Sequence, residues 1–297
     1  MKGKFVVIEG LDGVGKSTLI RNLTNVMTKV VTFSPSTLCK TELWKDKLDW
    51  LTGINGLPND IPLYKTLHKI NYDEVSDIIK VINSILDMLH EEIKINGHKC
   101  KHNDSYKYNS LMSAYIELGV LLTPLINYLK DQGYVVIADR WMASSIAYNG
   151  LIENTYVSKA MQLSTKLSRG YLCYNPNVEI EDDDIELYQH LTKFLHTSVQ
   201  DVIVPDVFIY LQENISGIIE NINKRGEASI FESERKLTRT SEVYGTLIRT
   251  QQLGDNAVLN LGESISVFSN VLTLGEKLVT EKVLERLKLL LDTQYFL

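Results

Sequence analysis

The sequence lacks the features that mark secreted, membrane-spanning and DNA-coating proteins. Its 297 residues include three cysteines, Cys39, Cys100 and Cys173, whose odd number and wide spacing fit neither a disulfide framework nor a metal site. No run of eighteen apolar residues occurs, and Glu9 interrupts the apolar run after Lys4, which argues against a membrane span and a signal peptide. The net charge is −6 without a basic arm, which argues against duplex DNA as the main partner. We therefore expect a soluble, cytoplasmic protein with no nucleic-acid or membrane partner.

The chain also has only six prolines and no linker rich in glycine or proline, and 44% of its residues are apolar, enough for one sizeable core. Short β-branched runs alternate with longer helical patterns, which is typical of a parallel sheet covered by helices on both faces. We predict one α/β domain over 1–297 with a five-stranded parallel sheet. The predicted strands are Phe5–Glu9, Val30–Phe33, Tyr134–Asp139, Asp206–Leu211 and Ala257–Leu261. Ligands of such a sheet bind beyond the carboxyl ends of its strands.

A phosphate-binding pattern follows the first predicted strand. Gly10 and Gly15 are separated by four residues and followed by Lys16 and Ser17. Such glycines let backbone N–H groups point at phosphate oxygens, and the next helix adds its positive end. We expect Lys16 to be an exposed loop charge that reaches the β and γ phosphates of ATP, and Ser17 to bind Mg²⁺. The predicted ATP-binding residues are Gly10, Leu11, Asp12, Gly13, Val14, Gly15, Lys16, Ser17 and Thr18.

A charged pair, Asp139-Arg140, ends the third predicted strand and is expected at the mouth of the same crevice. Taken alone, this pair could equally form an ion pair or cap the next helix. Two further motifs accompany it. They are Ser144-Ser145-Ile146-Ala147-Tyr148-Asn149-Gly150 and Pro205-Asp206-Val207-Phe208-Ile209-Tyr210-Leu211.

Taken in this order, the motifs resemble those of the thymidylate kinase family of P-loop nucleoside monophosphate kinases. The corresponding family patterns are G-[LV]-[DE]-G-x-G-K-[ST], D-R-[YH], S-S-x-A-Y-Q-G, P-D-L-x-L-Y-L and a basic lid. The matching segments are roughly residues 1–35, 110–150 and 204–262, about half of the chain. The resemblance implies a P-loop kinase fold, ATP with Mg²⁺ as the phosphoryl donor and a deoxynucleoside monophosphate as the acceptor.

The resemblance also implies roles for individual residues. Asp12 is expected near the acceptor phosphate, its metal and the sugar 3′ hydroxyl, Arg140 between the two phosphates, Tyr115 against the base and Tyr148 against the ribose 2′ position. The expected catalytic residues are Lys16, Asp12, Arg140, Arg225, Arg235 and Arg239. The expected acceptor-binding residues are Asp12, Tyr115, Asp139, Arg140, Ser144, Ser145, Tyr148 and Asn149, and the metal ligands are Ser17 and Asp12.

The lid is expected at about 223–240. Because Gly13-Val14 offers no arginine in the loop, the resemblance implies that Arg225, Arg235 and Arg239 supply positive charge around the transferring group. The alternative is a solvated helix face, although the like charges of Arg235 and Arg239, four residues apart, disfavour it.

Three positions depart from the family pattern, and all three concern the acceptor. Gly119 stands where the family has an arginine before the third strand, Phe33 replaces the arginine after the second strand, and Asn149 replaces a glutamine. Losing two guanidinium groups removes strong, geometrically selective contacts. The resemblance implies dTMP as the first acceptor. Because of the three departures, dUMP or a modified dUMP is the close alternative.

Two other classes of function compete with this interpretation. A deoxynucleoside kinase needs a general base after the second strand, but residues 33–36 contain no carboxylate. A nucleotide-binding regulator of the guanine-reading type needs N-K-x-D, and the segment Asn223-Lys224-Arg225-Gly226 fails at its last position.

Two segments exceed the family's usual length, at about 36–110 and 151–203, and we expect helical insertions there. The first contains Asp73–Ile95, whose apolar residues follow a helical period; such a stripe suits a core or a dimer face, and we expect a homodimer. The second contains the acidic run Glu179–Asp184, which favours a solvated loop over a metal site because consecutive carboxylates repel each other.

Overall fold

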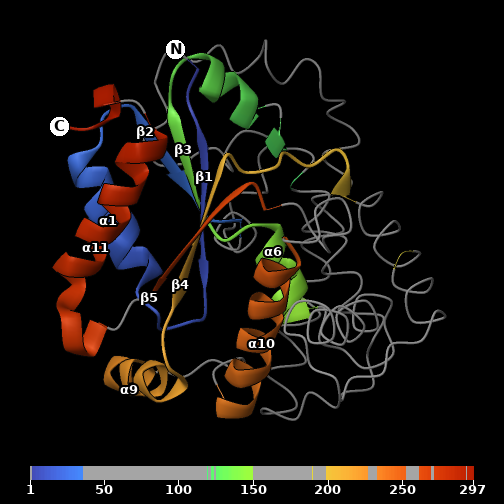
Figure 1. Cartoon of the computed structure of the whole chain (residues 1–297), viewed down its shortest axis with the longest axis vertical. Helices are drawn as coiled ribbons and strands as arrows, with labels where there is room; N and C mark the ends of the chain where they lie inside the picture. Colours follow the sequence, from blue (N-terminus) through green and yellow to red (C-terminus); the bar gives the residue numbers. More distant parts are fainter. Residues whose placement is uncertain are drawn as a thin grey trace, which may run out of the picture.

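The computed structural model describes residues 2–35, 119, 122–123, 125–149, 189, 199–226, 233–251, 261–268, 271–291 and 293–297. Within these ranges, parallel strands pair in the order β2-β3-β1-β4-β5 (Figure 1). The strands are β1 (Phe5–Gly10), β2 (Val30–Phe33), β3 (Val135–Asp139), β4 (Val207–Gln212) and β5 (Glu263–Phe268). The predicted α/β fold with a parallel sheet is confirmed.

The last strand of the described sheet does not lie where predicted. Strand β5 covers Glu263–Phe268 and begins beyond the end of the predicted Ala257–Leu261; Leu261 is not in a strand, and residues 257–260 lie outside the described ranges. The strand begins Glu-Ser-Ile-Ser, and this polar start conceals it from a search for apolar runs. In the described sheet β5 is an edge strand that pairs with β4 alone, and an edge tolerates polar residues that a central strand would not.

Helices form a layer on each face of the sheet (Figure 1). Helices α1 (Lys16–Val26) and α11 (Val271–Leu290) cover one face, and α6 (Met142–Ser144) and α10 (Glu234–Thr250) lie on the other. Alternation along β1 divides its side chains between these layers. Val6 and Ile8 join the core under α1 and α11, where each fully buried apolar side chain contributes about 1.5–3 kcal/mol. Glu9 has the opposite parity and therefore faces α6 and α10.

The remaining described elements are α9 (Ile215–Arg225), the π-helical turn η3 (Ser145–Asn149), η6 (Thr293–Tyr295) and a helix over 125–131. No helix in the described ranges is both long and apolar enough to cross a membrane. The predicted insertions, including the helix at Asp73–Ile95 and the acidic run Glu179–Asp184, lie almost entirely outside the described residues. The single-domain organisation therefore stays a prediction.

Candidate active site

The loop between β1 and α1 has the backbone of an anion-binding turn. Gly10, Gly13 and Gly15 have φ values of 145°, 80° and 95°, in the left-handed region that favours glycine. A Cβ atom on Gly10 would lie 2.6 Å from the carbonyl oxygen of Leu211, so a side chain cannot be accommodated there. Gly15 is the N-cap of α1 and provides no side-chain cap, so the first N–H groups of the helix are available to an anion. Ser17, in the first turn, is exposed.

Lys16 is buried, which corrects the prediction that it is an exposed loop charge. Its side chain is wrapped by the loop, and Nζ donates to the carbonyl oxygens of Leu11 at 2.8 Å and Gly10 at 3.1 Å. The residue is 7% exposed. Burial, with a further contribution from the nearby Arg140 charge, lowers the pKa of the Lys16 amine to about 8. The loop therefore encloses the Lys16 amine at the position expected for phosphate binding.

Arg140 leaves β3 and reaches across to the same loop. Its backbone has a φ of 75°, a strained value that costs a non-glycine residue on the order of 1–3 kcal/mol. The N–H of Arg140 donates to Ile8 O at 3.0 Å and holds this turn against β1. In the side chain, Nη1 donates to Gly10 O at 3.0 Å and Nη2 to Asp12 Oδ1 at 2.5 Å. The guanidinium is therefore fixed against the phosphate loop at two points.

Tyr148 completes this cluster from the π-helical turn η3. Its hydroxyl accepts from the Asp12 N–H at 3.2 Å, and Arg140 Cζ lies 4.8 Å from the centre of its ring, a cation–π distance. Burial alone would raise the pKa of Asp12, but the charges of Arg140 and Lys16 outweigh burial and hold that pKa below its ordinary value. Asp12 is thus an ionised carboxylate in a fixed orientation.

Glu9 is a polar centre that the sequence reasoning missed. Its side chain is fully buried, and Oε1 accepts from the N–H groups of Trp141 at 2.7 Å and Ser144 at 3.0 Å. The other oxygen, Oε2, accepts from the Tyr244 hydroxyl at 2.8 Å and from the Ser144 hydroxyl. Burial raises the pKa of Glu9. The sequence does carry a signal for it, because an acid within a buried central strand must find partners, whereas Glu9 is treated above only as a break in an apolar run.

The predicted acceptor residues are only partly brought together. Ser144 is engaged with Glu9, Tyr244 and Arg140, and Ser145 is buried at the start of η3. Asp139 Oδ1 is buried and has no hydrogen-bond partner among the described residues. Tyr115 lies outside the described residues, as does the side chain of Asn149.

The two positions that lack the expected arginines lie in apolar surroundings. Gly119 is buried, and a Cβ atom there would lie 3.0 Å from Met142 Cε and 3.0 Å from Val202 Cγ1. Phe33 is 5% exposed and packs edge-on against Trp141, with ring centroids 5.9 Å apart. These described neighbours are apolar, so they offer no hydrogen-bond acceptor to a guanidinium.

The predicted lid falls between two helices. Helix α9 ends at Arg225, with Gly226 as its left-handed C-cap, and α10 begins at Glu234. Arg225 and Arg235 are exposed and Arg239 is half-buried; residues 227–232 lie outside the described ranges. Among the described residues, no ion pair joins Arg235 or Arg239 to another side chain.

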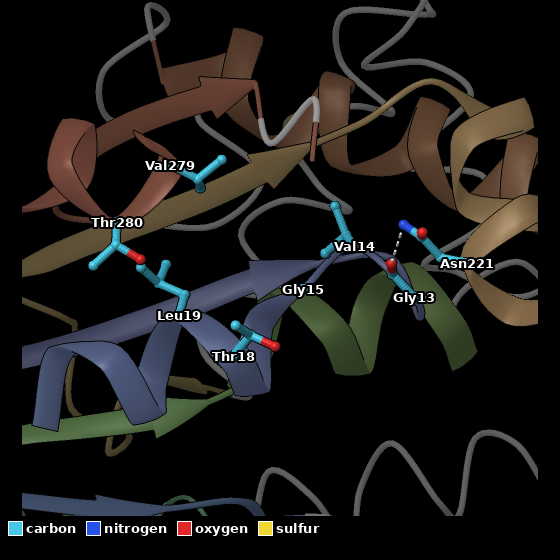
Figure 2. A pocket seen from close by; sticks show the side chains of 8 residues that line it. All are labelled: Gly13, Val14, Gly15, Thr18, Leu19, Asn221, Val279 and Thr280. Atoms are coloured by element: carbon cyan, nitrogen blue, oxygen red, sulfur yellow. Dashed lines mark hydrogen bonds between the residues drawn. The ribbon is translucent and has the colours of Figure 1, made fainter. Parts of the chain in front are cut away.

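A pocket of about 180 Å³ opens beside the loop, between α1, α9 and α11 (Figure 2). Its lining residues are Gly13, Val14, Gly15, Thr18, Leu19, Asn221, Val279 and Thr280. Asn221 Nδ2 donates to Gly13 O at 3.2 Å and so attaches α9 to the loop. The sequence motif identified the loop side of this pocket. No pattern in the sequence pointed to the residues from α9 and α11.

Comparisons with known proteins agree with the motifs. No family model matches the chain. A thymidylate kinase from Pseudoalteromonas translucida is 26% identical over 189 residues, covering 61% of this chain and 69% of the relative. The chain is thus similar to thymidylate kinases, which confirms the resemblance to a divergent P-loop kinase of that type.

Two solved structures were also found. One is a thymidylate kinase from Candida albicans, with a TM-score of 0.47 and 15% identity over 97% of this chain and 92% of the other. The second is a deoxyadenosine kinase from M. mycoides, with a TM-score of 0.43 and 14% identity over 96% of this chain and 98% of the other. At these TM-scores neither structure informs the fold of this chain.

Proposed function

We propose that this chain transfers the γ-phosphoryl group of ATP, with Mg²⁺, to a deoxypyrimidine nucleoside monophosphate. The expected first acceptor is dTMP, converted to dTDP for DNA precursor synthesis, and dUMP or a modified dUMP is the close alternative. The placement of Arg140 carries the proposal. Arg140 follows β3, the neighbour of β1, and its guanidinium bonds the phosphate loop at both Gly10 O and Asp12 Oδ1. One cation fixed beside the loop at the carboxyl ends of two strands would border both the donor and the acceptor phosphate.

The donor side is supported by the loop and the pocket beside it. Gly10 to Thr18 would surround the phosphates of ATP, since the loop offers free N–H groups and the buried amine of Lys16. The pocket lined by Thr18, Asn221 and Thr280 would accept the part of the donor beyond its phosphates. The thymidylate kinase likeness favours ATP as the donor.

The residues at the loop suit a hard cation that prefers oxygen ligands. Ser17 has an exposed hydroxyl, Asp12 is ionised, and Asp139 Oδ1 is a buried oxygen without a partner among the described residues. Mg²⁺ prefers such oxygen ligands and retains several waters and phosphate oxygens. In the described ranges no three His, Cys, Asp or Glu side chains cluster for a metal. When bound, the ion would neutralise charge on the β and γ phosphates.

Phosphoryl transfer requires little covalent chemistry from the protein itself. An oxygen of the acceptor phosphate forms a bond to the γ-phosphorus while the bond from that phosphorus to the β–γ bridging oxygen breaks, and ADP leaves. An ionised phosphate needs no base, which agrees with the absence of a carboxylate at Phe33-Ser34-Pro35. Lys16 and Arg140 would stabilise the charge on the transferring group. Arg225, Arg235 and Arg239 would join them when the lid closes over the donor.

The acceptor side favours a relaxed choice of base. With Gly119 packed against Met142 and Val202, and Phe33 against Trp141, neither position supplies a guanidinium. The acceptor would instead be held by contacts from Tyr115, Ser144, Ser145, Tyr148 and Asn149. The insertions would be a further source of such contacts. Asp12 and Tyr148 lie together, as the recognition of a deoxyribose would require.

An ADP-release assay with ATP and Mg²⁺ across all nucleoside monophosphates and all deoxynucleosides tests the proposal. We expect turnover with dTMP or dUMP and little with purine monophosphates. Turnover only with unphosphorylated deoxynucleosides would replace the proposal with a deoxynucleoside kinase. No turnover with any acceptor would leave nucleotide binding without catalysis.

A further inference from the structure

Tyr244 is a fully buried residue of α10 whose hydroxyl lies at the centre of a polar network. It donates to Glu9 Oε2 at 2.8 Å, lies 2.7 Å from Ser144 Oγ, and accepts from Arg140 Nη1 at 3.5 Å. The ring packs against Tyr210 of β4, with centroids 5.0 Å apart. A phenylalanine would fill the same volume, so packing alone does not account for the hydroxyl.

The other members of the network fix the turn that holds Arg140. Glu9 accepts from the N–H groups of Trp141 and Ser144, the residues that directly follow Arg140 and begin α6. Ser144 Oγ in turn accepts from Arg140 Nη1 at 3.1 Å. A buried network whose members are all satisfied has one preferred geometry, because each unmade hydrogen bond would leave a buried polar atom unpaired. Tyr244 is the member contributed by α10.

Helix α10 therefore connects two groups of charges. Its first two turns carry Arg235 and Arg239, and the turn containing Tyr244 is bonded to the network around Arg140. Figure 1 shows α10 lying beside α6 at this face of the sheet. Any displacement of α10 along its axis would move its arginines and the Tyr244 hydroxyl together.

We propose that the Tyr244 hydroxyl is a positioning group that fixes helix α10, and with it Arg235 and Arg239, relative to Arg140. The inference rests on the proposed function, since it concerns charges placed around a transferring phosphoryl group. Tyr244 does not reach the reacting atoms; it acts through Glu9, Ser144 and Arg140.

The test compares Tyr244→Phe with Tyr210→Phe. Each variant removes one hydroxyl from the same aromatic pair. The Tyr210 hydroxyl also bonds α10, through the side chain of Ser241, and no hydrogen bond among the described residues joins it to Glu9 or Arg140. For Tyr244→Phe we expect kcat to fall about ten- to a hundredfold while KM for ATP changes by less than about threefold. For Tyr210→Phe we expect both constants to stay within about twofold of wild type.

An unchanged kcat in Tyr244→Phe would overturn the inference. So would equal losses in the two variants, because the hydroxyl would then only hold the helix in place. If Tyr244→Phe does not fold, Ser144→Ala removes another bond of the same network and should lower kcat in the same way; an unchanged kcat there would also refute the coupling. Wild-type protein without kinase activity would instead refute the proposed function, and the inference with it.

Discussion

The two sides of the proposed site are built from different elements and differ in chemistry. On the donor side, backbone N–H groups, Lys16 and Arg140 converge on the phosphate loop. On the acceptor side, the two places where thymidylate kinase-like chains would have arginine are occupied by Gly119, against Met142 and Val202, and by Phe33. In the proposed function, ATP binding depends on the first arrangement whatever the acceptor is, whereas the second would set which acceptor is chosen. We therefore propose that the chain keeps the donor half of the site and has an altered acceptor half.

Removing the buried amine of Lys16 should have the largest effect on activity. Lys16→Ala should lower kcat/KM for ATP roughly a thousandfold or more, since it removes charge stabilisation at the donor phosphates. Because Lys16 also donates to two loop carbonyls, a modest loss of thermal stability should accompany this change. The matched control is Lys2→Ala, an exposed lysine paired with Asp131. Near-normal turnover of Lys16→Ala would disprove the phosphate loop.

Arg140→Lys should come next, with a loss of kcat on the order of a hundredfold. Lysine keeps the positive charge but cannot bond Gly10 O and Asp12 simultaneously with a planar fork. Arg21→Lys, on the exposed side of α1, is the control and should be neutral. If steady-state kinetics show the two variants to be equal, Arg140 does not border both phosphates.

The lid arginines should have smaller, unequal effects. Alanine at Arg225, Arg235 or Arg239 should lower kcat more than it raises KM for ATP, at least tenfold for the dominant one, because their charge is needed in the transition state. Arg249→Ala, at the other end of α10, is the control. Three variants with unchanged kcat would mean that the lid lies elsewhere.

The pH dependence should report the burial of Lys16. Its pKa of about 8, below the ordinary 10.5, means that the free protein loses this charge as the pH rises through 8. We expect kcat/KM for ATP to fall about tenfold per pH unit above that value, and this fall to vanish in Lys16→Arg, which stays charged. A wild-type profile that is flat up to pH 10 would contradict the buried position.

The sequence predicted the parts of the molecule that are dictated locally. The bounds of strands β1 to β4 agree with the prediction within a residue or two, because buried β-branched runs strongly favour a strand. The spacing of the glycines likewise indicates the backbone conformation of the loop. Strand β5 was misplaced because an edge tolerates polar residues. The position of Glu9 in a strand shows that it needs partners, but its hydrogen-bond partners and those of Tyr244 are 100 or more residues away in the chain. No local pattern identifies such partners.

Discrimination between dUMP and dTMP tests the contrast between the two halves most directly. A methyl group in an apolar pocket is worth only about 1–3 kcal/mol, and a pocket without guanidinium contacts has few means to add to that preference. Measured side by side, kcat/KM for dUMP should fall within roughly a hundredfold of that for dTMP, with purine monophosphates well below both. Much stronger rejection of dUMP, or a preference for a purine, would contradict the claim that the acceptor half has been altered toward a relaxed pyrimidine site.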